Sequence, residues 1–183
     1  DRLLSRGLGD VYKRQWEISK ELPVHLCSIS GLICCFIMFI PKNKRQFLFE
    51  FLFYCGIIGG IQAILTPLLD DYGGYDFFYI QFFFKHAMII AFPIYLRNNL
   101  GMKLTKFSWL KTWVVLNIFM FILIPLNNFL GSNYMYVNVP PAVDNPMVIG
   151  EWPTYLYWWE LFVLILILLV FVIGKPKTFE KIN

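Results

Sequence analysis

Five long apolar runs, separated by short polar loops, divide this chain and limit what it can fold into. Each run holds about twenty residues, the length that an α-helix needs to cross a hydrocarbon core of about 30 Å. A helix is also required there, because an unpaired backbone group in lipid has no water to bond. The sequence therefore predicts an all-α fold, a polytopic transmembrane helical bundle. The five predicted spans cover residues 22–40, 47–68, 77–96, 109–130 and 153–173.

Composition excludes a soluble domain. Hydrophobic residues make up 58% of the chain, whereas soluble domains are typically about 45–50% apolar. Charged residues are only 15% of the total, and they gather between the apolar runs. We therefore expect an integral membrane protein whose loops carry its charge.

Basic and acidic loops alternate along the chain. The positive-inside rule places the basic loops, and with them the C-terminus, in the cytoplasm. The segment before residue 22 would then lie outside, and an additional upstream span would bring the N-terminus inside, so we expect six or more spans in the full-length protein. The basic residues are Lys42, Lys44, Arg45, Arg97, Lys103, Lys106, Lys175, Lys177 and Lys181, and the acidic ones are Asp70, Asp71, Asp76, Asp144 and Glu151.

The first fifteen residues, DRLLSRGLGDVYKRQ, have neither the apolar core nor the cleavage site of a signal peptide. Their tail resembles translated sequencing adapter, so we expect residues 1–15 to be a non-native leader and residues 16–183 to form one transmembrane domain. Without the leader, Lys and Arg fall from 16 to 12, and Asp and Glu from 12 to 10. No basic face remains to bind nucleic acid, and membrane lipids are the predicted partners.

Four cysteines lie inside the apolar runs, and none forms a CxxC pair. They are Cys27, Cys34, Cys35 and Cys55. This spacing predicts neither a disulfide framework nor a zinc site, and no motif implies a cofactor.

Polar side chains inside the spans are costly, so they mark where function should be sought. Among them, His25 and Cys27 are two residues apart and lie on nearly opposite sides of a regular helix. His86, from another helix, is therefore the better base for Cys27. A thiol beside an imidazole is the minimal apparatus for nucleophilic acyl chemistry. The polar residues selected for this reason are His25, Cys27, Gln62, Thr66, Lys85, His86, Asn117, Asn128 and Glu160.

Purely structural interpretations of the same residues stay open. Cysteine is commonly a small apolar filler in membrane helices, and Lys85 can extend its ammonium toward the outer headgroups. Asn117 and Asn128 can tie helices together. The second predicted span also contains three glycines, whose small size favours the close approach of helices. They are Gly56, Gly59 and Gly60.

Five sequence blocks, in a fixed order, carry a family resemblance: WEISKELPVHLCSIS, GGIQAILTP, KHAMIIAFPIYL, GSNYMYVNVPP and GEWPTYLYWWE. Their combination resembles the YwaF-like family of bacterial integral membrane proteins, from Trp16 to the end of the chain. The family's aspartate after the TP pair is absent, because Leu68 and Leu69 precede Asp70 here. The resemblance implies a multi-pass protein of the bacterial cell membrane.

A more distant resemblance links this family to eukaryotic cysteine-dependent membrane phospholipid acyltransferases. There a cysteine in an early helix and a histidine in a later one are implicated, and the matching positions are Cys27 and His86. A looser likeness reaches the androgen-induced-gene type of lipid-ester hydrolases, which use a threonine and a histidine. The resemblance implies a lipophilic acyl substrate.

Two functional hypotheses follow. In the first, the chain is an intramembrane acyltransferase or lipid-ester hydrolase with Cys27 as nucleophile and His86 as base. Gln62 and Thr66 would donate hydrogen bonds to the developing oxyanion, and Glu160 would orient His86. In the second, a non-catalytic carrier or lipophilic-ligand receptor uses the same pocket, although the chain lacks the internal repeats of many carriers. A structural subunit of a larger complex is a blander alternative.

Overall fold

The computed structural model describes residues 18–67, 69, 77–142 and 145–178. Within these residues the regular structure is helical, as the apolar runs predict. The predicted leader 1–15 lies outside the described residues, as do the acidic loop residues Asp70, Asp71, Asp76 and Asp144 and the basic residue Lys181.

Four described helices are long and apolar enough to cross a membrane. They are the combined helix Gln46–Leu65, then Tyr79–Leu100 within α6 (Phe77–Leu100), α7 (Ser108–Leu130) and α8 (Thr154–Gly174). Their bounds agree with the predicted spans to within a few residues. These four helices confirm the polytopic bundle.

The first predicted span is shorter than expected. It consists of α3 (Leu26–Phe36) and the 3₁₀ turn η1 (Ile37–Phe39), preceded by the short helix α2 (Ile18–Glu21). At 1.5 Å per residue this apolar helix is about 21 Å long, less than the hydrocarbon core. The chain before it turns at Pro23, where the N–H of Val24 bonds the carbonyl of Leu22 at 2.8 Å. This turn delays the start of the helix.

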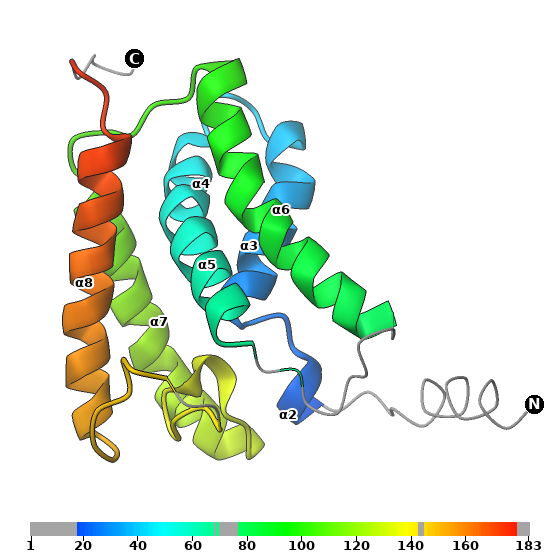
Figure 1. Cartoon of the computed structure of the whole chain (residues 1–183), viewed down its shortest axis with the longest axis vertical. Helices are drawn as coiled ribbons and strands as arrows, with labels where there is room; N and C mark the ends of the chain where they lie inside the picture. Colours follow the sequence, from blue (N-terminus) through cyan, green and yellow to red (C-terminus); the bar gives the residue numbers. More distant parts are fainter. Residues whose placement is uncertain (1–17, 68, 70–76, 143–144, 179–183) are drawn as a thin grey trace, which may run out of the picture.

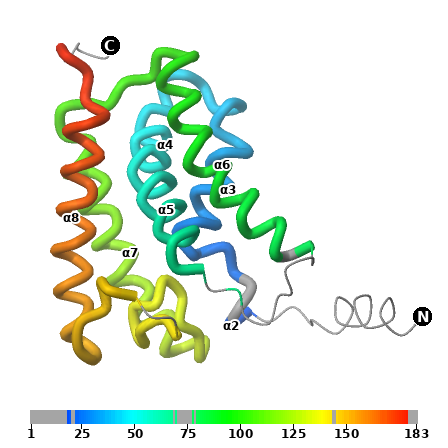
Figure 2. Tube along the Cα trace, viewed as in Figure 1, coloured from blue at the N-terminus to red at the C-terminus, as the bar shows by residue number. Residues whose placement is uncertain are grey.

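The second span is the central helix of the bundle (Figure 1). It comprises α4 (Gln46–Phe51), the π-helical turn η2 (Leu52–Gly56) and α5 (Ile57–Leu65). In Figures 1 and 2, α7 and α8 lie side by side on one side of it, and α3 and α6 lie on the other. The loop between α7 and α8 covers the end of the bundle that is opposite the C-terminus.

Glycines bring the central helix against its neighbours. A Cβ atom on Gly56 would stand 2.5 Å from the backbone oxygen of Ile89 in α6, and one on Gly60 would stand 3.1 Å from that of His86. Gly59 faces α3 instead. Because helices in lipid associate by close packing and hydrogen bonding, these contacts confirm the role expected of the three glycines. They also fix α6, which carries His86, directly against α5.

Two apolar clusters fill the bundle. One lies around the central helix and includes Phe49, Leu52 and Tyr54 together with Leu96 and Ile167. The other lies beneath the α7–α8 loop and contains Leu123, Tyr134, Val137, Tyr155 and Leu156. Many large apolar side chains remain on the outer surface, among them Phe129, which is 86% exposed. Such a surface suits lipid rather than water.

Candidate functional site: an apolar cavity inside the bundle

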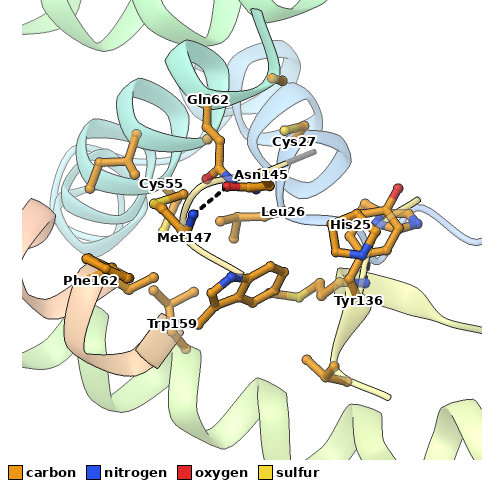
Figure 3. Close-up of a pocket in the computed structure, with 18 of the residues that line it drawn as sticks. His25, Leu26, Cys27, Cys55, Gln62, Tyr136, Asn145, Met147, Trp159 and Phe162 are labelled. Carbon is orange, nitrogen blue, oxygen red and sulfur yellow. Dashed lines mark hydrogen bonds between the residues drawn. The ribbon is translucent and has the colours of Figure 1, made fainter. Parts of the chain in front are cut away.

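A cavity of about 510 Å³ lies between the helices and the α7–α8 loop. This volume is within the range of small-molecule sites, roughly 300–1,000 Å³. Each of the five sequence blocks that carry the family resemblance contributes to its wall. All five predicted site residues line it: Cys27, Gln62, Thr66, His86 and Glu160. Figure 3 shows Cys27, Gln62 and Trp159 arranged around this space.

Cys27 is the second residue of α3 and lies against α5. Its Sγ atom is 3.6 Å from the position that a Cβ on Gly59 would occupy, so the glycine leaves space beside the thiol. All four cysteines have free thiols. Cys55, from the π-helical turn, also lines the cavity, whereas Cys34 and Cys35 do not. Position therefore separates Cys27 and Cys55 from the other two cysteines.

His86 is buried on α6 and its tautomer is defined by one contact. Nδ1 lies 2.7 Å from the carbonyl oxygen of Phe82, one helical turn earlier. A carbonyl oxygen can only accept, so Nδ1 carries the proton and Nε2 of the neutral ring carries the lone pair. The Phe82 ring packs on the imidazole, with centroids 4.2 Å apart. His86 thus has a fixed ring and an available basic nitrogen.

Cys27 and His86 line the same cavity from different helices, α3 and α6. No hydrogen bond joins them among the described residues, where Nδ1 of His86 bonds the carbonyl of Phe82. Catalytic hydrogen bonds are often long or poorly aligned before a substrate binds. The arrangement supplies a thiol and an imidazole lone pair to a common apolar space.

The two predicted oxyanion donors differ. The hydroxyl of Thr66 donates to the backbone oxygen of Gln62 at 3.0 Å, so its proton is already used within the helix. The side-chain amide of Gln62 has no hydrogen-bond partner in the part of the chain that the structure describes. Gln62 is therefore the better placed donor of the two.

Glu160 is held by α7 rather than by His86. Its Oε2 atom accepts a hydrogen bond of 2.9 Å from Nδ2 of Asn117, which also donates to the backbone oxygen of Trp113. Asn117 therefore links α7 to α8, as its position in a span suggested. Glu160 was expected to orient the His86 ring. The carbonyl of Phe82, one turn earlier on the same helix as His86, bonds the ring instead.

Lys85 and His25 also contact the cavity. Lys85 extends from α6 to α3, where Nζ donates to Oγ of Ser28 at 3.1 Å. His25 occupies the N-cap position of α3, and its Nδ1 accepts a hydrogen bond of 3.3 Å from the backbone N–H of Met135. The His25 ring also packs against Tyr136, with centroids 5.5 Å apart. Both side chains are thus tied to protein groups beside the cavity.

Asn127 organises the loop that closes the cavity, and sequence reasoning missed it. Its side chain is 1% exposed and makes four hydrogen bonds, to Ser132, to the backbone N–H and oxygen of Tyr134, and to Asn138. The loop that it holds contains Met135 and Tyr136, whose φ angles of 56° and 54° are strained for residues with a side chain. Both of these residues line the cavity.

Glu50 is the second residue that the sequence analysis missed. It is a fully buried carboxylate near the other end of the central helix. Oε1 accepts hydrogen bonds from the backbone N–H of Thr105 and from Gln46, both at 3.0 Å. A single acidic residue in an apolar run is a signal that could have identified it. Its contacts hold the α6–α7 loop and lie outside the cavity.

No group of three or more His, Cys, Asp or Glu side chains that could hold a metal ion occurs among the described residues.

Fold and cavity together define a multi-pass helical membrane protein with a polar cluster inside an otherwise apolar chamber. The family model of the TMEM164 family matches residues 3–171. The chain belongs to the TMEM164 family, a family of membrane proteins. No curated protein and no solved structure matches the chain.

Proposed function

We propose that this chain is an intramembrane acyltransferase or lipid-ester hydrolase in which Cys27 is the nucleophile and His86 the base. The observation that carries the proposal is the placement of both side chains on one cavity, with the lone pair of His86 on Nε2. A base oriented by a third group is the general arrangement of activated nucleophiles. Here the third group is the carbonyl of Phe82.

The proposed reaction has two steps. In the first, Nε2 of His86 takes the thiol proton, Sγ of Cys27 bonds the ester carbonyl carbon, and the C–O bond of the ester breaks. The imidazolium returns its proton to the departing alkoxide. In the second, the hydroxyl of an acceptor loses its proton to Nε2, its oxygen bonds the thioester carbon, and the C–S bond breaks. The imidazolium then returns that proton to Sγ of Cys27, which restores the thiol and the neutral imidazole. Water as acceptor makes the reaction a hydrolysis.

The walls of the cavity suit such a substrate. Most of the lining side chains are apolar, including Met120, Leu156 and Phe162, and they would accommodate an acyl chain. The free amide of Gln62 would donate to the oxyanion that forms at the carbonyl. Thr66 would support Gln62 through its bond to that residue's backbone oxygen.

The proposal includes a location. The alternation of basic and acidic loops favours a cytoplasmic C-terminus. The α7–α8 loop, which supplies part of the cavity wall, lies at the opposite end of the bundle (Figure 1), so the cavity would open to the outer leaflet. The narrower resemblance to YwaF-like proteins adds a bacterial cell membrane to this proposal.

A non-catalytic role for the same cavity is the second candidate, as a receptor or carrier for a lipophilic ligand. The observation that favours it is that Cys27 and His86 are not hydrogen-bonded to each other in the described part of the chain. Binding needs only the chamber, whereas catalysis needs the thiol and the imidazole together.

An acyl probe distinguishes the two. The full-length protein in detergent with native lipid is incubated with an alkyne-tagged acyl thioester, and the label is tested for release by neutral hydroxylamine, which cleaves thioesters. We expect Cys27→Ala to abolish labelling and His86→Ala to slow it by about 100-fold or more, as the loss of a general base does. Cys34→Ala is the matched control, because Cys34 is on the same helix but does not line the cavity. Equal labelling of all variants would overturn the catalytic proposal.

A further inference from the structure

Among the described residues that line the cavity, Lys85 is the one Lys or Arg. Its side chain runs along α3, where Cε lies 3.8 Å from the position of a Cβ on Gly31 and Nζ donates to Ser28. The ammonium therefore points along the wall that carries Cys27, instead of extending to the headgroups. Lys85 and Ser28 directly neighbour His86 and Cys27 in sequence.

This ammonium has no carboxylate partner in the described part of the chain, where Lys111 and Glu50 form an ion pair at the other end of the central helix. Among the described lining residues, the carboxylate is that of Glu160, which bonds Asn117 between α7 and α8. A cation inside a membrane protein that lacks a paired anion is costly. An anion that enters the cavity would offset this cost.

The hydrogen bond between Lys85 and Ser28 leaves several donors for such an anion. Ser28 accepts from Nζ, so the Ser28 hydroxyl keeps its own proton to donate. An ammonium has three N–H groups, so two remain on Lys85 after the bond to Ser28. Three donors on one wall, beside an apolar chamber, match the oxygen atoms of a carboxylate or phosphate.

We propose that Lys85 and Ser28 form an anion-binding subsite that selects a single-chain amphiphile with a negatively charged head. The apolar chamber holds the chain, and the subsite holds the head next to Cys27 and His86. The proposal rests on the proposed function in that the ligand is a lipid that enters the same cavity. Its binding does not require the acyl chemistry, so the two can fail separately.

The test compares ligands that share one chain and differ in the head. Displacement of tritiated palmitate from the full-length protein, in an uncharged detergent at mildly alkaline pH, is measured with palmitate, hexadecyl phosphate and hexadecanol. We expect one or both anions to compete about 10- to 100-fold better than hexadecanol, the usual range for a charge-assisted hydrogen bond. The stronger anion identifies the source, a fatty acid or a phosphorylated lipid.

Variants assign the effect to the subsite. Lys85→Gln is expected to remove the preference for anions, Lys85→Arg to keep it, and Ser28→Ala to reduce it. Arg97→Gln is the matched control, because Arg97 is an α6 cation that does not line the cavity. The same measurement on Cys27→Ala should give the wild-type preference, which separates binding from catalysis. Equal competition by all three ligands in the wild type would overturn the proposal, whether or not the variants fold.

Discussion

Nδ1 of His25 accepts a hydrogen bond from the backbone N–H of Met135, 110 residues later in the chain. This bond attaches the start of α3, which carries Cys27, to the loop that follows α7. The neighbouring hydroxyl of Tyr134 strengthens the attachment, because it donates to the backbone oxygen of Ile18 at 2.6 Å and accepts from the N–H of Leu22 at 3.0 Å. The LPVHLC and NYMY blocks therefore form one wall of the cavity.

Removing the Tyr134 hydroxyl should loosen this wall. Tyr134→Phe keeps the buried ring and leaves the backbone groups of Ile18 and Leu22 without their partner. Both bonds are only partly buried and Ile18 is exposed, so we expect a loss of about 0.5–1.5 kcal/mol, the net contribution of an ordinary hydrogen bond. Thermal unfolding in detergent measures it, and faster maleimide labelling of Cys27 would report the loosened helix start. Tyr157→Phe, at a residue that is 73% exposed, should have no effect.

Close packing of the central helix on α6 predicts that Gly56, the last residue of the π-helical turn η2, cannot be replaced by a larger residue without a loss of stability. In Gly56→Ala the new Cβ would meet the backbone oxygen of Ile89 at 2.5 Å, and a backbone atom cannot rotate away. The helices would have to separate, at a cost of about 1–3 kcal/mol for overpacking. Gly31→Ala is the control, because its Cβ would make an ordinary contact of 3.8 Å with Lys85. Equal unfolding temperatures for the two variants would contradict this account of the interface.

The length and hydropathy of the runs predicted most of the fold. Residues 77–96, 109–130 and 153–173 became α6, α7 and α8 with small shifts at their ends. The shortened α3 was not predicted, because hydropathy does not register a turn at Pro23. The π-helical turn at 52–56 was not predicted either, since it depends on how the central helix packs and leaves no periodic signal.

The sequence predicted which residues form the candidate site more reliably than it predicted which residues contact one another there. Costly polar groups in spans identified Cys27, His86 and Gln62, and all three line the cavity. Their partners could not be read from the sequence. Glu160 binds Asn117, and His86 bonds its own helix, because side-chain direction within a bundle depends on helix rotation. The rotation of each helix about its own axis is difficult to predict from the sequence.

Asn127 should be the residue on which the α7–α8 loop depends. Asn127→Ala removes four hydrogen bonds at a buried position, and we expect a loss of about 2–4 kcal/mol, at the upper end for single substitutions. Asn128→Ala is a matched control one residue away, where an exposed side chain accepts one bond from Asn138. Unfolding temperature and the rate of proteolysis within residues 131–139 both report the difference. Similar results for the two variants would show that the loop is held by other contacts.

The buried carboxylate of Glu50 should act as an acceptor more than as a charge. Glu50→Ala leaves the N–H of Thr105 and the amide of Gln46 unpaired, which should cost about 1–3 kcal/mol. Glu50→Gln keeps an acceptor oxygen and loses only the pairing with Lys111. That pair is 3.7 Å long and Lys111 is half exposed, so its contribution is about 0–1 kcal/mol. Chemical or thermal unfolding should therefore rank wild type first, Glu50→Gln close behind and Glu50→Ala last. A Glu50→Gln variant as unstable as Glu50→Ala would mean that the charge, not the hydrogen bonds, fixes the α6–α7 loop.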